Sequence, residues 1–315
     1  MVRWTSALQS GTDAEKTAAV DGLSRLPAQT LPRGTVLALL SELGRVHQGL
    51  LNGTAVTILG AEEDHGEFYL QLVLTIAELR TPEAALALVP AIAVSGSVER
   101  RVARYGGDAV VAPLIALVER RYSDDDALET LGLLWFWADS TGSALSDGSR
   151  SMILSTLGAA AMTGAHRQML GVLGALREMR LPSLLAMAQV LRTVAVAQGD
   201  VGHFTVYELD NDVLPFLTAA AASRTDLQLV QSVSRMLAAI CGLPTTGRRQ
   251  GTCQSATNHV ATAARHFENG RYGPARNVYG SAAAELKRAA DSGDLTPAEY
   301  AMLSGDLLAL LARSW

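Results

Sequence analysis

The chain has 315 residues, 49% of them hydrophobic and 18% charged, so it is long enough to bury a core and too apolar for a disordered protein. Its 26 basic residues face 31 acidic ones, a net charge of −5 that argues against general binding to nucleic acid. No apolar run approaches the roughly 18 residues of a membrane span, and the run from Ala84 to Val94 contains Pro90. These features predict a soluble, folded protein with no membrane span.

Most of the chain carries the spacing of amphipathic helices. Apolar residues recur three and four positions apart, as at Leu131, Leu134 and Ala138, so that each predicted helix has one apolar face. Short turn clusters rich in glycine and serine separate these helices. Two segments, Thr54–Leu59 and Phe204–Leu209, fit either short strands or extended loops inserted between helices. The predicted fold class is all-α.

A proline motif recurs at the start of predicted helices, where the missing N–H group of proline is not needed. An apolar residue precedes the proline and an apolar run follows it at Leu31-Pro32, Val89-Pro90, Ala112-Pro113, Leu181-Pro182 and Leu214-Pro215. Helices with a charged first turn follow several of these motifs, at Ser97–Ala103, Asp124–Leu128 and Asp226–Val230. Over about residues 5–242, these helix pairs resemble bacterial HEAT-like, armadillo-type repeat proteins. The resemblance implies an α-solenoid of helical pairs, which we assign to residues 1–242.

A different helical segment follows the predicted repeats. The composition changes at Leu243–Thr252, which we expect to be a loop between units. Further on, Thr296 and Glu299 have the spacing of a capping box at the start of the last helix. The turn Ala263–Gly270, the alanine-rich helix after it and the leucine-rich last helix resemble the FIMAH domain, a helical module at the C-termini of many secreted bacterial proteins. The resemblance implies a small, non-catalytic helical hairpin or bundle at residues 253–315 and an extracytoplasmic setting.

Two cysteines flank the predicted loop. Cys241 closes one predicted helix and Cys253 opens the next, so a disulfide between them is geometrically easy. Such a bridge would contribute about 3 kcal/mol by constraining the unfolded chain. The alternative is two unrelated free thiols. We favour the disulfide, because the chain has no other cysteine.

Two groups of acidic residues are candidates for metal binding. The densest cluster contains Glu62, Glu63, Asp64 and His65. An apolar run follows it, so solvated charge at the positive end of a helix is favoured over a metal site. A second group alternates like the start of a calcium loop and consists of Glu208, Asp210 and Asp212. It lacks the turn glycine and the closing glutamate of that loop, and we expect Asp212 to cap a helix that begins at Val213 instead.

The remaining charged and titratable clusters have structural interpretations. A basic turn contains Arg100, Arg101 and Arg104. In stacked repeats such arginines pair with acids of the neighbouring unit, and Asp124–Asp126 begin the next helix of this kind. His259 and His266 lie seven positions apart, too far for a helical metal pair, and are interpreted as half-buried histidines. The sequence contains no Gly-x-Ser-x-Gly elbow, His-Glu-x-x-His pair, Gly-x-Gly-x-x-Gly turn or Cys-x-x-Cys pair, so we predict no cofactor and no catalytic residue.

The most informative apolar feature is an aromatic triplet, Trp135, Phe136 and Trp137, on one predicted helix. At 100° per residue the three rings sweep about 200° around the helix, so they cannot share one buried stripe. In a two-layer array at least one ring should lie at a groove or edge, where aromatic residues favour partner binding. The alternative is that neighbouring repeats cover both flanks of the helix.

Together these features predict a non-enzymatic helical-repeat scaffold that binds another protein through its curved surface at the aromatic triplet. One alternative is an enzyme or enzyme subunit with a site formed by the irregular inserts 54–67 and 200–212. Another is a structural protein that self-associates through its ends, where Trp4 and Trp315 lie. A secreted or extracytoplasmic location is favoured over a cytoplasmic one, although the first residues lack the apolar core of a signal peptide, as a mature form would.

Overall fold

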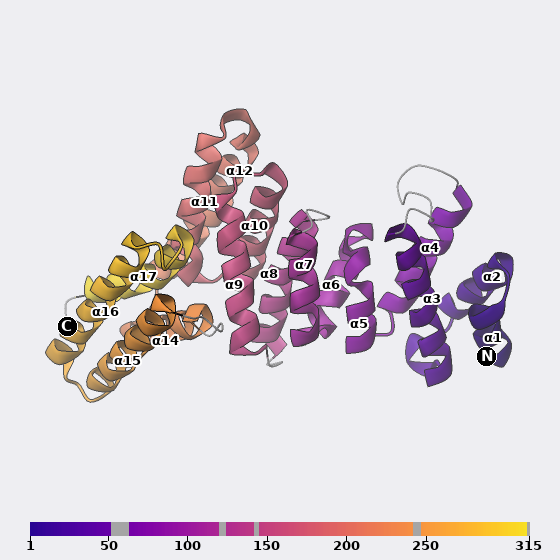
Figure 1. Cartoon of the computed structure of the whole chain (residues 1–315), viewed down its shortest axis with the longest axis horizontal. Helices are drawn as coiled ribbons and strands as arrows, with labels where there is room; N and C mark the ends of the chain where they lie inside the picture. The colour runs from indigo at the N-terminus through magenta and orange to yellow at the C-terminus, as the bar shows by residue number, and fades with distance from the viewer. Residues whose placement is uncertain (52–62, 120–123, 142–144, 242–246, 314–315) are drawn as a thin grey trace. The chain divides into compact units, whose positions relative to one another are not determined.

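The computed structural model describes residues 1–51, 63–119, 124–141, 145–241 and 247–313 (Figure 1). Every regular element in these ranges is a helix, which confirms the all-α prediction. No helix of the described ranges is both long and apolar enough to cross a membrane. The chain divides into two compact units, Met1–Leu117 and Val118–Trp315.

The first unit is built from helices that pack on the next α-helix along the chain or on the one after it. Their bounds are α1 (Val2–Ser10), α2 (Asp13–Ser24), η1 (Ala28–Thr30), α3 (Arg33–Leu51), α4 (Glu63–Ala77), α5 (Pro82–Leu88), η2 (Val89–Val94), α6 (Gly96–Tyr105), η3 (Gly107–Val110) and α7 (Val111–Glu119), which crosses the boundary between the units. Helix α1 contacts α2 and α3, and α4 contacts α2, α3 and α5. The core between α3 and α4 contains Leu39, Leu43, Leu72, Val73 and Ile76. Within each helix these residues lie on one face, as the apolar spacing of the sequence predicts.

The second unit contains longer helices. Their bounds are α8 (Asp124–Thr141), α9 (Asp147–Met162), α10 (His166–Met179), η4 (Pro182–Leu184), α11 (Leu185–Ala197), η5 (Gly199–Val201), α12 (His203–Glu208), η6 (Leu209–Val213), α13 (Leu214–Ala222), α14 (Asp226–Cys241), α15 (Arg248–Glu268), α16 (Tyr272–Asp291) and α17 (Pro297–Leu311). The pairs α8 with α10 and α15 with α16 make the most extensive contacts among the described helices. Helix α9 contacts α10, α11, α14 and α17, so it lies at the centre of this unit.

Glycines allow α8 and α10 to approach closely. A Cβ atom added at Gly132 of α8 would lie 2.5 Å from the Cα of Ala175 in α10. One added at Gly171 of α10 would lie 2.7 Å from the Cα of Asp125 in α8. Both distances are shorter than atoms in contact can adopt, so the backbones of the two helices pack directly on each other.

The predicted helix starts agree with the structure at several positions. Pro182 lies in the first turn of η4, where proline costs no backbone hydrogen bond. Pro215 instead lies inside a continuous helical stretch. The capping box of α17 is confirmed. The N–H group of Glu299 donates to Oγ1 of Thr296 over 3.2 Å, and the N–H group of Thr296 donates to Oε2 of Glu299 over 2.9 Å.

The segment 203–222 differs from the prediction. It runs as one continuous helical stretch through α12, the π-helical turn η6 and α13, so the strand or extended-loop interpretation of Phe204–Leu209 is wrong. Asp212 lies inside η6 and does not cap a helix that begins at Val213. Pro215 explains the π turn, because its ring excludes the carbonyl four residues earlier and widens the turn before it. The other segment, Thr54–Leu59, lies outside the described residues.

The predicted division of the chain also differs from the compact units, whose boundary lies at Leu117 and Val118. Residues 248–252 belong to α15, so the loop prediction is wrong for them, and residues 242–246 lie outside the described residues. Helix α17 packs on α9, α11 and α14 as well as on α16. The buried apolar residues of α17 cover more than one face of the helix, which the apolar spacing of the sequence did not show.

Candidate protein-binding surface

Helix α8 presents the aromatic triplet in three different environments. The side chain of Trp135 is 1% exposed and that of Phe136 is 38% exposed, while Trp137 is half-buried. The packing of α10 on α8 covers the stripe that includes Leu128 and Gly132, and Trp135 continues this stripe one turn further. A rotation of about 100° per residue brings the next ring, that of Phe136, to the surface.

Phe136 and Trp137 form an edge-to-face pair. Their ring centroids lie 5.6 Å apart with an angle of 71° between the planes, the geometry that aromatic rings prefer. We call these two residues the α8 aromatic pair. They give the surface of α8 a large apolar contact that is supported from one side by a second ring.

Trp135 instead belongs to the interior. Its Nε1 donates a hydrogen bond to Oδ2 of Asp139, 3.0 Å away. Nη2 of Arg150 donates to Oδ1 of the same carboxylate over 2.7 Å, and the Arg150 guanidinium lies 4.6 Å from the Trp135 ring centroid. Sequence reasoning missed both partners. Asp139 follows Trp135 by four positions, a recognisable helical spacing, whereas Arg150 is on α9 and no local signal identifies it.

The candidate metal cluster at the start of α4 lies outside the described residues. Glu62 precedes the described part of α4, and the side chains of Glu63, Asp64 and His65 are likewise outside the description. Among the side chains that are described, no group of three or more His, Cys, Asp or Glu residues is arranged to hold a metal ion. The metal interpretation of the cluster therefore stays untested.

The acids of the second insert, residues 200–212, are paired with arginines. Glu208 and Asp212 both accept hydrogen bonds from Arg177 of α10, and the distance from Arg177 Nε to Asp212 Oδ2 is 3.0 Å. Asp210 accepts two hydrogen bonds from Arg192 of α11, of 2.6 and 2.8 Å. The Arg192 guanidinium lowers the pKa of Asp210 by hydrogen bonding. These three carboxylates therefore do not form a calcium loop, because each of them already binds the side chain of an arginine.

Arg101, in the basic turn of α6, pairs with a different acid from the one expected. Arg101 binds Glu78, with 2.9 Å between Nη2 and Oε1. Asp125, one of the expected partners, instead binds Arg167 of α10 over 2.8 Å. The prediction of an intramolecular ion pair is confirmed for Arg101. Its partner is not one of Asp124–Asp126 but Glu78, the residue directly after α4, and α4 packs beside α6.

The two histidines of α15 are half-buried, as predicted. His259 Nδ1 lies 3.2 Å from Oε2 of Glu285 on α16, so this ring contributes to the packing of the α15–α16 hairpin. At the N-terminus, the ring of Trp4 packs against Gly22 of α2, where an added Cβ would lie 2.7 Å from Cζ2. Trp4 therefore covers a helix of its own unit, and Trp315 lies outside the described residues.

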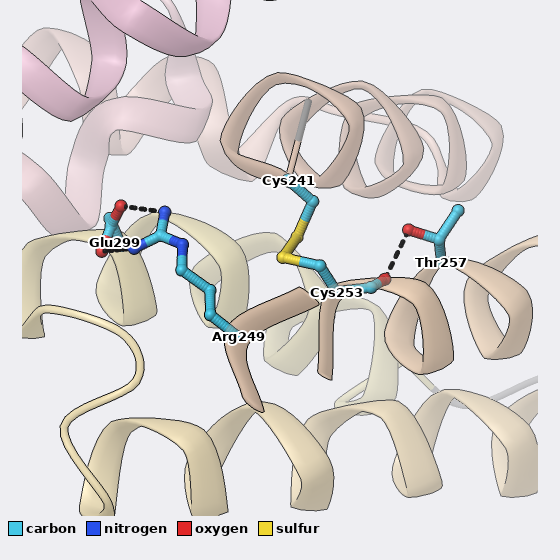
Figure 2. The surroundings of a disulfide bond; sticks show 5 residues. All are labelled: Cys241, Arg249, Cys253, Thr257 and Glu299. Carbon is cyan, nitrogen blue, oxygen red and sulfur yellow. Dashed lines mark hydrogen bonds and ion pairs between the residues drawn. A yellow bond between two sulfur atoms is a disulfide. The ribbon is translucent and has the colours of Figure 1, made fainter. Parts of the chain in front are cut away.

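The structure joins Cys241 and Cys253 in a disulfide, the pairing that the sequence favours, with 5.4 Å between the Cα atoms (Figure 2). The bridge connects the end of α14 to the first turns of α15. One turn before Cys253, Nη2 of Arg249 binds Oε1 of Glu299 on α17 over 2.6 Å. Burial acts to raise the pKa of Glu299, and the hydrogen bonds from Arg249 and Thr296 outweigh it, so the pKa is lowered. The start of α15 is thus attached covalently to α14 and ionically to α17.

Comparisons with protein-family models, with curated proteins and with solved structures find no match to this chain.

Proposed function

We propose that the protein is a non-enzymatic α-solenoid scaffold of HEAT-like helical pairs that binds another protein through the α8 aromatic pair. The exposure of Phe136 beside Trp137 is the observation that carries the proposal. Helices that pack on their sequence neighbours, such as α3 on α4 and α15 on α16, support the repeat architecture. In this proposal, the C-terminal helices α15, α16 and α17 form the FIMAH-like module.

The chemistry of α8 fits a binding hot spot. Aromatic residues are enriched at the centres of protein interfaces because they bury a large area with few rotatable bonds. Because the ring of Phe136 is already held in an edge-to-face contact with Trp137, it loses little conformational entropy on binding. The neighbouring residue Trp135 is buried and is bound by Asp139 and Arg150, which fixes this part of α8.

We further propose that the protein works outside the cytoplasm. The Cys241–Cys253 disulfide supports this location, since structural disulfides persist in oxidising compartments. The enzyme alternative needs free acids in the insert 200–212, and Glu208, Asp210 and Asp212 are engaged by arginines. That alternative gains no support from the described part of the insert.

The test begins with affinity capture from the source organism and mass spectrometry of the bound proteins. Binding of the captured partner is then measured for Phe136→Ala, which should weaken it by about 2 kcal/mol or more if the ring is a hot spot. Phe204→Ala is the matched control, because Phe204 is 52% exposed on α12 of the same unit and should leave binding unchanged. Loss of binding in both variants, or in neither, contradicts the proposal.

A second comparison separates the aromatic pair from the acidic cluster. Replacing Glu62, Glu63, Asp64 and His65 together should not change partner affinity. If that replacement abolishes binding while Phe136→Ala does not, the partner site lies at the start of α4 and the α8 proposal is wrong.

A further inference from the structure

Helix α8 carries an acidic residue on the same face as Phe136. Glu129 lies seven positions before Phe136, so the two side chains are about 20° apart around the helix and about 10 Å apart along its axis. Glu129 is half-buried and Phe136 is 38% exposed, whereas Gly132 packs on Ala175 of α10. This side of α8, which we call the Glu129–Phe136 face, therefore has an acidic end and an aromatic end.

Helix α10, which packs beside α8 (Figure 1), brings a second acid to this face. A Cβ atom added at Gly174 of α10 would lie 2.8 Å from Oε2 of Glu129, so the Glu129 carboxylate lies against the α10 backbone. Glu178 follows Gly174 by four positions and lies on the same side of α10. The glycine contacts between α8 and α10 advance in the same direction along both helices. Glu178 therefore lies further toward the Phe136 end of α8 than Gly174 does.

Neither of these two carboxylates forms an ion pair within the described residues. No hydrogen bond of the described chain involves the side chain of Glu129 or Glu178 either. Arg177, the residue before Glu178, binds Glu208 and Asp212, so its guanidinium is already engaged by two other acids. The two acids of the Glu129–Phe136 face are therefore left to each other.

The electrostatics of Glu129 show an excess of negative charge at this point. Burial, followed by the charges of Glu178 and Asp126, raises the pKa of Glu129. Arg177 acts in the opposite direction, and Asp125 adds a further, smaller rise. The acids thus outweigh the one arginine that acts on Glu129, and a positive charge placed between α8 and α10 here would be stabilised.

The composition of this face selects a basic polypeptide over a metal ion or a purely apolar partner. The acids in the described part of the chain are not arranged to hold a metal ion. A guanidinium, in contrast, has enough donors to bind carboxylates from two neighbouring helices. The edge-to-face pair of Phe136 and Trp137 adds a large apolar contact that a simple cation would not use. An occupant that satisfies both ends of the face carries a basic and an apolar side chain.

We infer that the Glu129–Phe136 face binds a segment of a partner protein in which a basic side chain lies about 10 Å from an apolar one. The basic group lies between the carboxylates of Glu129 and Glu178, and the apolar side chain packs on Phe136 and Trp137. This assignment rests on the proposed function, since the α8 aromatic pair supplies the apolar half of the surface, and it adds the chemistry of the partner.

The probe is an alanine-based helical peptide of about 18 residues, blocked at both ends and labelled with a neutral fluorophore. It carries one arginine and, seven positions later, one leucine. Fluorescence anisotropy should show saturable binding to the full chain, with a dissociation constant in the micromolar to millimolar range. A peptide with glutamine in place of the arginine should bind at least about tenfold more weakly, because it loses the charge-assisted hydrogen bonds. Moving the leucine two positions, to the opposite side of the peptide helix, should weaken binding as well.

Variants of the protein then place the peptide on the face. Glu129→Gln combined with Glu178→Gln should weaken binding of the arginine peptide at least about tenfold. Glu268→Gln is the matched control and should leave binding unchanged, because Glu268 is an exposed glutamate of α15 that has no ion pair with any described residue. In an NMR titration, the bound arginine peptide should lower the pKa of the Glu129 carboxyl by stabilising its ionised form. Thermal denaturation checks that each variant folds.

The outcomes separate this inference from the proposed function. Equal binding of the arginine and glutamine peptides overturns the inference, and if Phe136→Ala weakens both, the α8 aromatic pair still stands as an apolar site. Absence of saturable binding also overturns the inference, while the captured partner tests the aromatic pair independently. Equal loss in Glu268→Gln and in the double variant would show nonspecific charge attraction and overturn it. Binding that depends on arginine and is unchanged by Phe136→Ala would show that the acids and the rings do not form one surface, with the same consequence.

Discussion

The indole Nε1 of Trp135 donates a hydrogen bond to Oδ2 of Asp139, 3.0 Å away and one turn further along α8. The same carboxylate binds Arg150, whose guanidinium lies over the Trp135 ring. The cluster connects α8 to α9 at the point where the neighbouring residue, Phe136, reaches the surface. Two adjacent aromatic residues therefore have different roles, and substitution of each should have a different consequence.

Trp135→Ala should lower the free energy of unfolding by about 3 to 5 kcal/mol, because it removes a large buried ring and leaves a cavity. Phe136→Ala should cost less than about 1 kcal/mol, since the ring is 38% exposed and leaves no cavity. Urea denaturation followed by circular dichroism measures both. Equal losses in the two variants would show that Phe136 is part of the core and would remove the basis of the proposed surface.

The close approach of α8 and α10 predicts a strong effect of one methyl group. Gly132→Ala should destabilise the protein by about 1 to 3 kcal/mol, because the new Cβ overlaps the backbone of Ala175. Gly280→Ala provides the control: Gly280 is within α16 and an added Cβ there meets no atom within 4 Å. That variant should gain roughly 0.5 to 1 kcal/mol from the better helix propensity of alanine. A neutral Gly132→Ala variant would contradict the direct backbone packing.

The disulfide predicts the behaviour of the thiols. Denatured, unreduced protein should contain no free thiol, because Cys241 and Cys253 are the chain's two cysteines and are bonded. Reduction should lower the free energy of unfolding by about 3 kcal/mol, as expected for a short loop. The double variant Cys241→Ala with Cys253→Ala should be insensitive to the reductant. Two free thiols in protein made under oxidising conditions would count against both the bridge and the extracytoplasmic location.

Acid should weaken the first unit through His47. Burial lowers the pKa of His47 to about 4, and Nε2 of this ring lies 3.0 Å from the Tyr69 hydroxyl. The unfolded chain, with a histidine pKa of about 6.5, binds the proton more tightly than the folded protein. Stability from this group is therefore complete above about pH 6.5 and decreases as the pH falls toward 4, by on the order of 3 kcal/mol.

Denaturant unfolding of the wild type and of His47→Gln between about pH 7 and pH 4 measures this difference. Glutamine does not titrate, so the variant should show a shallower loss of stability on acidification. Parallel pH profiles for the two proteins would mean that His47 is protonated in the folded state and is not protected by burial.

Local features of this chain follow from the sequence alone. The apolar spacing predicts helices because residues three and four positions apart share one helical face, and the structure is helical in all the regular elements described. The capping box of Thr296 and Glu299 involves residues three positions apart, and the proline start of η4 requires no distant partner. The cysteine pair is close in sequence, so a single loop brings it together.

The tertiary structure decided which side chains meet across the chain. Arg224 binds Asp306, 82 positions further along the chain. Arg177 of α10 binds both Glu208 and Asp212, for which the sequence suggested a calcium loop or a helix cap. Which ring of the aromatic triplet is exposed depended on the packing of α10 on α8. The physical reason is the same in each case: helical periodicity is set by backbone geometry within one turn, whereas ion-pair partners and exposure depend on how separate helices pack, which a one-dimensional pattern does not encode.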